Sequence, residues 1–256
     1  LCQIDDTIGL AWISLASGEL HVSECTHATL TSELERIRPV EILLDETQPI
    51  ALPPLSLNQC ATGKLAAWYF DAEKNKSYLC EQLEVLDLAP FGCSHMAAAI
   101  GAAGALLRYI NSTQGLAPSQ RLGHIQHISV ETQSTYLGLD SATRRNLELT
   151  ETLRGQASPT LFSLLDHCYT SMGSRLLRHW LHHPLRDHSQ PRLRQDAIAT
   201  LINSTTGTPH THHHTSNLTS YLRQCADVER ITARLALLSA RPRDLSSLRQ
   251  TLQQLP

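Results

Sequence analysis

The chain has 256 residues, 41% of them hydrophobic, and a formal net charge of −3 at pH 7. This length favours two domains of about 100 to 200 residues each. The sequence contains neither an apolar run of about 18 residues nor a charged segment followed by a short apolar one, so it predicts no membrane span and no signal peptide. Its seven cysteines are scattered without a CxxC motif, which is typical of the reducing cytosol, and we expect a cytoplasmic protein.

The first segments predict an antiparallel meander. Residues 1–4 and 8–15 are apolar and are separated by a turn at residues 5–7, which predicts a hairpin. The second strand is apolar on both faces, so we expect it in the middle of its sheet, and Leu20 and Val22 alternate with polar residues in a third, more exposed strand. Because the chain begins without Met and inside the first strand, we expect it to be a piece of a longer protein, with that strand truncated.

A helix and a parallel strand follow the meander. From Ala28 the apolar residues recur at helical spacing, and Pro39 ends that helix. Residues 40–44 are almost continuously apolar, as expected of a parallel strand covered on both sides. The predicted order is therefore β-β-β-α-β, which is how the ribonuclease-H-like fold begins.

The next segments complete the first domain. Residues 46–64 are rich in Pro and predict a surface connection, and residues 66–70 could return as a strand before a helix that Asp71 caps. Residues 94–110 predict a buried helix whose small residues allow close approach of a neighbour: Ala98, Gly101, Ala102 and Ala105. The polar residues 111–123 predict the domain boundary.

The stretch from Leu139 to Asp187 is the most distinctive part of the chain. It contains an arginine-asparagine turn and two apolar helical segments, with Ser158-Pro159 as the predicted start of the first and Thr170 or Ser171 as the cap of the second. Pro184 ends the second helix. Further helices are predicted at 189–201, 218–225, 228–238 and 242–255.

The sequence offers few candidate groups for enzymatic chemistry or metal binding. A ribonuclease-H-like nuclease would need metal-binding carboxylates on strands, but Asp5 and Asp6 fall in a predicted turn, which leaves only Asp45 and Glu46. The tract His210 to His214 contains no cysteine or carboxylate at ligand spacing and is better interpreted as a loop. Two weaker metal candidates, Cys93 with His95 and the His182-His183 pair, are expected at element ends for structural reasons. A phosphate-binding loop and a Gly-x-Ser-x-Gly elbow are both missing from the sequence.

Three segments carry a resemblance to a known family. They are LDSATRRNLELTETLRG at 139–155, TLFSLLDHCYTSMGSRLLRHWLHHPLRD at 160–187 and ADVERITARLALLSARPRDLSSLRQTLQQLP at 226–256. Here the sequence resembles the MutS family of DNA mismatch repair proteins, its bacterial members in particular. The weaker likeness of the first domain is to the connector of that family.

The resemblance implies two domains and a non-catalytic role. Residues 1–115 would form a ribonuclease-H-like α/β connector with a mixed sheet, residues 116–138 a linker, and residues 139–256 the first part of an all-α core or lever domain. The mismatch-reading domain, the clamp and the ATPase domain of the family are missing, so the segment itself would hold no catalytic, cofactor or metal site. The longer protein would bind mismatched duplex DNA, use ATP and Mg²⁺ and form a homodimer, whereas this piece could be monomeric.

The resemblance also suggests two groups of residues. A contact with the partner MutL is expected at an exposed helix start, Lys74, Asn75 and Lys76. The core motif would hold domain junctions in register, although caps and buried packing would explain its residues equally well. Its residues are Thr143, Arg144, Arg145, Asn146, Glu148, Gly173, Ser174, Arg175, Trp180, Pro184 and Arg186.

The chain thus has two candidate functions of different classes. The first is an allosteric connector and core segment of a MutS protein, which couples mismatch binding to the ATPase. The alternative is a stand-alone ribonuclease-H-like nuclease or a helical interaction scaffold built on the same two domains.

Overall fold

The computed structural model describes residues 1–15, 17–48, 50–52, 60–115, 121–132, 135–203 and 212–254. The chain divides into two compact units. The first comprises Leu1–Thr132 with Thr232–Ser239, and the second comprises Gln133–Ile231 with Ala240–Pro256. Each unit is described separately below.

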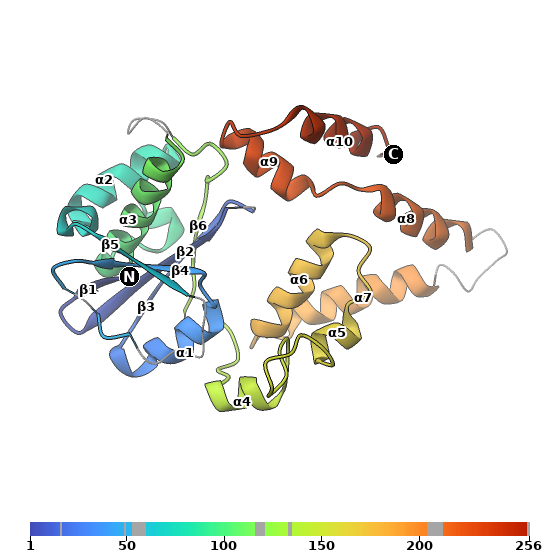
Figure 1. Ribbon diagram of the computed structural model, residues 1–256, viewed down its shortest axis with the longest axis horizontal. Coiled ribbons are helices and arrows are strands. Elements are labelled where there is room, and N and C mark those ends of the chain that lie inside the picture. The colour runs from blue at the N-terminus through green and yellow to red at the C-terminus, as the bar shows by residue number, and fades with distance from the viewer. Residues whose placement is uncertain are drawn as a thin grey trace. The chain divides into compact units, whose positions relative to one another are not determined.

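The first unit is built on a sheet with the strand order β1-β2-β3-β6 (Figure 1). Strands β1 (Cys2–Ile4), β2 (Thr7–Ser14) and β3 (Glu19–Cys25) are antiparallel, and β6 (Ile128–Val130) runs parallel to β3. The predicted hairpin and the inner position of its second strand are confirmed. Asp5 occupies the left-handed region of backbone space in the tight turn between β1 and β2, a conformation that Asp tolerates better than most residues.

The predicted β-β-β-α-β order is also confirmed. Helix α1 (His27–Ile37) is followed by β4 (Glu41–Asp45), which pairs in parallel with β5 (Ala61–Leu65). The predicted connection at residues 46–64 therefore overlaps a strand. Strand β5 has the sequence ATGKL, which shows no alternation of apolar and polar residues, and its residues are at least partly exposed. Its pairing therefore depends on its neighbour β4.

A short apolar run after β5 is helical where a strand was predicted. Residues Ala67–Phe70 form a 3₁₀ helix, η1. Four apolar residues are too few for hydrophobic periodicity to distinguish a helix from a strand, which explains the wrong prediction. Helix α2 (Ala72–Leu83) begins at the predicted cap, where the Asp71 side chain accepts a hydrogen bond from the backbone N–H of Lys74. A second 3₁₀ turn, η2 (Ala89–Phe91), precedes the longest helix of the unit.

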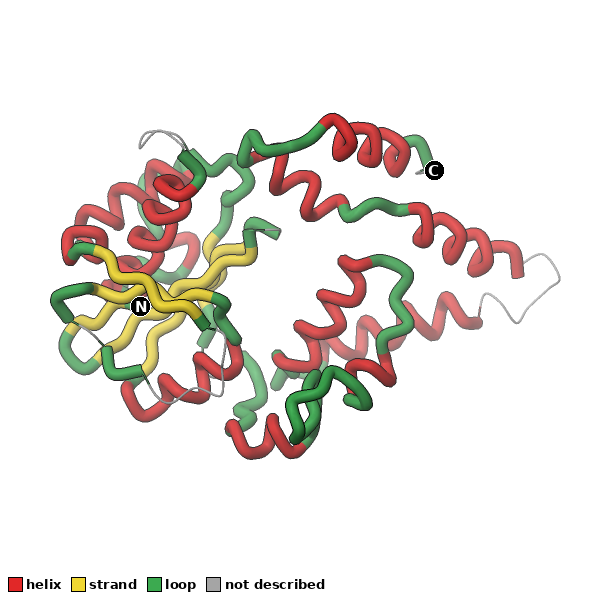
Figure 2. Tube along the Cα trace, in the orientation of Figure 1, coloured by secondary structure: helices red, strands yellow, loops and turns green. Residues whose placement is uncertain are grey.

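That helix, α3 (Ala97–Thr113), is the buried core helix that the sequence predicts. A Cβ atom on Gly101 would lie 2.7 Å from the carbonyl oxygen of Phe70, which confirms the expected close approach. Helices α2 and α3 pack on one side of the strands, and α1 packs against the other (Figure 2).

The first unit extends beyond the predicted boundary at residue 115. Leu122 and Ile125 are fully buried in its core, and β6 belongs to its sheet. The buried Gln82 holds this segment, since its amide nitrogen donates to the carbonyl oxygens of Leu122 and Ile125 and its amide oxygen accepts from the Leu122 N–H. Of the predicted linker at 116–138, residues 121–132 therefore belong to the first unit, while 116–120 and 133–134 lie outside the described residues.

The second unit is built mainly of helices. Thr160 caps α5 and Thr170 caps α6, so the Thr170 prediction is confirmed, whereas the helix predicted to start at Ser158-Pro159 begins two residues later. A single bridge between Tyr136 and Leu185 adds the only extended pairing among its described residues. The helices are α4 (Ser141–Asn146), α5 (Leu161–Leu165), α6 (Ser171–His182), α7 (Ser189–Asn203), α8 (His212–Gln224), α9 (Val228–Ala236, which ends in the first unit) and α10 (Pro242–Leu252).

Two predictions concern membranes and metals. Of the helices in the described ranges, none has both the length and the apolar character needed to cross a membrane. The His-rich tract lies largely outside the described residues, since 204–211 are not described and the side chains of His212 to His214 are not described either.

Candidate functional site in the helical unit

The arginine-asparagine turn of the second unit is a short capped helix. The Asp140 side chain accepts a hydrogen bond from the backbone N–H of Thr143 at 2.6 Å. Hydrogen bonding to Thr143, first to its side chain and then to its backbone, lowers the pKa of Asp140. The guanidinium of Arg144 donates to two carbonyl oxygens, those of Leu139 at 3.2 Å and His182 at 2.9 Å. Arg144 therefore ties α4 to the last residue of α6.

The end of α6 is fixed by further contacts with the segments on both sides of α4. His182 is buried, and its Nε2 lies 3.0 Å from the hydroxyl oxygen of Thr150. The carbonyl oxygen of Pro184 accepts from the Leu137 N–H at 2.8 Å, and the Arg186 N–H donates to the Thr135 carbonyl at 3.1 Å. The His182-His183 pair thus occupies an element end, as expected from the sequence.

Glu148 joins α4 to α5 through its backbone and its side chain. It has a left-handed backbone with φ of 43°, and its carbonyl oxygen accepts from the Leu161 N–H at 3.1 Å. Its carboxylate accepts from the Leu153 N–H at 2.7 Å. These contacts assign Glu148 a structural role in the turn after α4.

The start of α6 depends on Gly173 and Ser174. The Gly173 N–H donates to the capping hydroxyl of Thr170 at 3.1 Å. A Cβ atom on Gly173 would lie only 3.2 to 3.4 Å from Thr170 and Cys168 atoms, so a larger residue would crowd the cap. The Ser174 hydroxyl donates to the Asp166 carboxylate at 2.9 Å, which connects α6 to the residue after α5.

Arg175 is the centre of the most strongly charged contact of this unit. Its two terminal nitrogens each donate to one carboxylate oxygen of Asp227 at 2.7 Å, and one of them also donates to Glu229 at 2.7 Å. The hydrogen bonds with Arg175 lower the pKa of Asp227 to about 2, and the bonds to Asp227 raise the pKa of Arg175. Since Ser171 also donates to Asp227, this pair fastens the first turn of α6 to the start of α9.

Other motif side chains contact aromatic rings or solvent. The guanidinium of Arg194 stacks 4.0 Å from the centre of the Trp180 ring, and that of Arg178 lies 4.6 Å from the centre of the Phe162 ring. The side chains of Arg145, Asn146 and Arg186 are exposed.

The two best-placed motif arginines are engaged by groups of their own unit. Arg144 and Arg175 use their donors on carbonyl and carboxylate oxygens of the same unit, so these donors are already occupied by protein groups. Within the described residues, no group of three His, Cys, Asp or Glu side chains could hold a metal ion. Asp5 and Asp6 are exposed at the β1-β2 turn, and Asp45 accepts bonds from Thr47.

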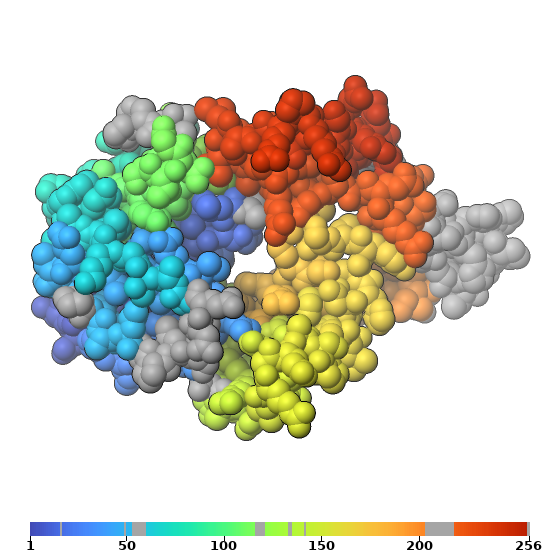
Figure 3. Space-filling view, in the orientation of Figure 1, coloured from blue at the N-terminus to red at the C-terminus, as the bar shows by residue number. Residues whose placement is uncertain are grey.

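The residues expected to contact a partner lie on α2 of the first unit, which reaches the surface of that unit (Figure 3). Lys74 is exposed and pairs with Asp71 at 2.8 Å, and Lys76 lies 3.6 Å from Asp87. Asn75, however, is 1% exposed, which differs from the expected exposed position. Its amide donates to the carbonyl oxygens of Tyr69 and Gly101 and accepts from Arg108 Nε, so it joins α2 to α3.

Comparison with protein families accounts for both units. A model of MutS domain II matches residues 1–126, and a model of MutS domain III matches residues 142–256. The chain belongs to the MutS family. The resemblance noted in the sequence is thereby confirmed, and the core motif from Thr143 to Arg186 lies within the match to MutS domain III.

Three supporting residues were missed by sequence reasoning. Asp227 and Glu229 hold Arg175, and His182 receives Arg144 on its carbonyl oxygen. Asp227 does carry a local signal, because it directly precedes α9 and accepts from the Arg230 N–H as a capping residue would. No feature of the local sequence predicts its pairing with Arg175, which is 52 positions away.

Proposed function

We propose that this chain is the non-catalytic connector and core segment of a MutS mismatch repair protein. In this proposal the longer protein binds mismatched DNA, hydrolyses ATP with Mg²⁺ and forms a homodimer. The segment couples the DNA-binding end to the ATPase and offers a docking surface to MutL. The consecutive matches to MutS domains II and III support this assignment.

The observation that carries the proposal is the internal engagement of the motif arginines. Arg144 and Arg175 connect the start and end of α6 to distant parts of the same unit through hydrogen bonds of 2.7 to 3.2 Å. Bidentate arginine-carboxylate contacts resist reorientation because two parallel bonds fix the planar guanidinium. A helix held in this way can transmit displacement as a rigid element, which is one means of coupling remote sites.

The first unit is proposed to be a ribonuclease-H-like connector without catalytic carboxylates. Three antiparallel strands, a helix and then a parallel strand follow in the order with which that fold begins. The Asp45 carboxylate accepts hydrogen bonds from the backbone N–H and the hydroxyl of Thr47, both at 2.7 Å, in the turn after β4. This contact favours a structural role for Asp45 over metal binding.

The proposed MutL surface comprises the exposed lysines of α2. Lys74 and Lys76 lie two positions apart, their side chains are accessible to solvent, and each makes an ion pair with a partly exposed carboxylate. The capping hydrogen bond to Asp71 comes from the backbone N–H of Lys74, which a side-chain substitution retains. Reversing the lysine charges should therefore leave α2 folded, and Asn75 belongs to the support beneath the surface.

Binding of MutL to the 256-residue chain tests this surface. We expect the double variant Lys74→Glu/Lys76→Glu to weaken binding by about tenfold, because rim charges mainly set association rate and salt dependence. Lys64→Glu, on the exposed part of β5, is the matched control and should bind as the wild type does. Equal affinity for all three chains in biolayer interferometry would refute the docking surface.

A further inference from the structure

Residues 121–127, which lead into β6, are held in the first unit by a few specific contacts. Leu122 and Ile125 are fully buried, and the amide nitrogen of Gln82 donates to both of their carbonyl oxygens. The Ile125 N–H donates to the Leu122 carbonyl at 2.8 Å, which closes a tight turn. His124 lies in this turn, so the contacts of Leu122 and Ile125 fix the position of its backbone.

His124 packs against the turn between β2 and β3. In that turn Gly18 has a φ of 73°, in the left-handed region that glycine adopts most readily. A Cβ atom on Gly18 would lie 2.6 Å from the His124 carbonyl oxygen and 3.0 Å from its ring Cδ2. The two turns are therefore in close contact, and the absence of a side chain at Gly18 makes that contact possible.

The ring of His124 is placed unfavourably for carrying a charge. Both of its nitrogens are shielded from solvent by the protein, and neither has a hydrogen-bond partner among the described residues. An imidazolium has two N–H donors and a positive charge, so it would lose more hydration here than a neutral ring does. Burial accordingly lowers the pKa of His124.

The charged groups of the two turns have other partners. Glu19, at the end of the β2-β3 turn, lies 3.9 Å from Nε2 of His21. Arg121, at the start of the segment, pairs with Glu84, which follows α2. Burial is the sole cause of the lowered pKa of His124, so no counter-charge in the described part of the chain compensates a proton on its ring.

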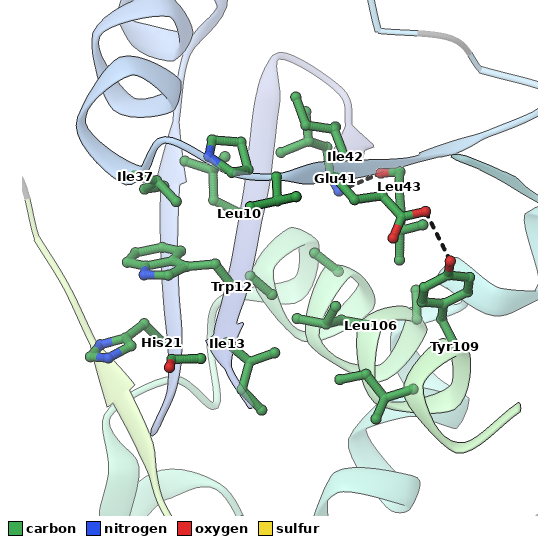
Figure 4. Close-up of a pocket in the computed structure, with 18 of the residues that line it drawn as sticks. Leu10, Trp12, Ile13, His21, Ile37, Glu41, Ile42, Leu43, Leu106 and Tyr109 are labelled. Atoms are coloured by element: carbon green, nitrogen blue, oxygen red, sulfur yellow. Dashed lines mark hydrogen bonds between the residues drawn. The ribbon is translucent and has the colours of Figure 1, made fainter. Parts of the chain in front are cut away.

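A second histidine of the same unit has a different setting. His21 lies beside Trp12, with the two ring centres 5.4 Å apart (Figure 4). Its Nδ1 is 3.1 Å from a carboxylate oxygen of Glu131. A carboxylate at this distance compensates a positive ring, whereas the described residues offer His124 none. Acid should therefore act on the contact of His124 before it acts on that of His21.

We propose that His124 is an acid-sensitive latch, which holds residues 121–127 on the β2-β3 turn when its ring is neutral and releases them when the ring takes up a proton. The charged ring is more stable in solvent than against the turn, so local opening becomes more frequent. The opening stays local because the end of β6 is held separately. The Glu131 N–H donates to the Val22 carbonyl at 2.9 Å, and its carboxylate accepts from Arg36 at 2.7 Å.

The direction of the pH effect follows from proton linkage. A histidine whose pKa is lowered in the closed state stabilises that state above its ordinary pKa of 6.5, and this contribution is lost as the pH falls below 6.5. One proton changes the opening equilibrium by at most about tenfold per pH unit in this range. We therefore expect opening of residues 121–127 to rise by up to about tenfold between pH 6.5 and about 5.5.

Hydrogen exchange of the 256-residue chain, followed by NMR and corrected for the intrinsic pH dependence of exchange, tests the latch. Below pH 6.5 the amides of Leu122 and Ile125 should lose protection, while the amides of the β2-β3 ladder keep theirs. The variant His124→Gln should remove this pH dependence, because its side chain does not titrate. His127→Gln is the matched control, since His127 is exposed in the same segment, and it should behave as the wild type does.

Titration of the His124 ring signals in the wild-type chain is a second readout, which remains decisive if His124→Gln opens the segment at every pH. The ring should titrate below pH 6.5. Titration at or above pH 6.5 would overturn the proposal, because the charged ring would then fit the closed state. So would protection of Leu122 and Ile125 that does not change with pH, the same pH dependence in His124→Gln, or an equal loss of protection across the β2-β3 ladder.

Discussion

Arg175 shows how much one side chain contributes to the second unit. It bonds both carboxylate oxygens of Asp227 and also Glu229, but both partners are partly exposed, which reduces the net gain. We expect Arg175→Ala to lower the free energy of unfolding by about 1–2 kcal/mol in urea titrations followed by far-UV circular dichroism. Arg186→Ala is the control, because Arg186 contributes a backbone hydrogen bond that the substitution retains. Equal losses for the two variants would contradict the assigned role of Arg175.

Glu131 gives the first unit a dependence on pH. It is buried, and burial alone would raise its pKa, but the contact with His21 at 3.1 Å and the charge of Arg36 at 2.7 Å outweigh burial and lower the pKa to about 2. The carboxylate therefore stabilises the fold fully above pH 4.5, its ordinary pKa, and this stability is lost as the pH falls toward 2.

The corresponding prediction concerns Glu131→Gln. Between pH 4.5 and about 2, the wild-type chain should lose about 3 kcal/mol more unfolding free energy than the variant. The variant is expected to be less stable at neutral pH, since Arg36 loses a charged partner. Parallel pH profiles for both chains, from urea unfolding at each pH, would rule out this origin of acid sensitivity.

Some residue roles could be predicted from sequence and others could not. Asp71 and Thr170 were found because a cap acts on a backbone N–H two or three residues away. Asn75 was expected at an exposed helix start from the family resemblance, yet it is buried and donates to carbonyl oxygens that tertiary packing brings close. Asp227 was missed because its partner Arg175 is also brought close only by tertiary packing.

At the scale of elements, the close contact between β2 and α3 depends on Gly9. A Cβ atom at this position would lie 2.0 Å from the backbone carbon of Ala98, and a helix backbone cannot yield as a flexible side chain does. We expect Gly9→Ala to cost about 3 kcal/mol of unfolding free energy. Gly123→Ala, where nothing lies within 4 Å, should stay within about 0.5 kcal/mol. Equal changes in melting temperature for the two variants would contradict this prediction, because they would show that β2 and α3 can move apart to accommodate the added methyl group.

The elements that sequence predicted best are those with strong local patterns. The hairpin, α1, β4 and α3 have clear periods or continuous apolar runs, and each is present. Strand β5 was not assigned, because five residues without a strong pattern pair only where a neighbouring strand is available. The same dependence explains why the first unit extends past residue 115, since Leu122 and Ile125 fill a core made by other elements.

At the scale of the whole molecule, both units belong to one chain of the MutS family, and its described residues contain no group of three His, Cys, Asp or Glu side chains that could hold a metal ion. The resemblance to this family could be read from the sequence at residues 139–187, because dense local motifs survive in the primary structure. The contacts of those motifs, such as that of Arg144 with the His182 carbonyl, could not be predicted without the fold. We propose that this chain supports mismatch recognition and ATP hydrolysis in a longer protein without performing either.

The most direct test is fluorescence anisotropy with matched and mismatched DNA duplexes, combined with a phosphate-release assay for ATP hydrolysis. We expect the chain to bind both duplexes weakly and with affinities equal within about twofold, and to lose most of this binding between about 50 and 200 mM salt. It should release no phosphate above background. A preference of about tenfold or more for the mismatched duplex, or sustained ATP turnover by the purified chain, would contradict the account.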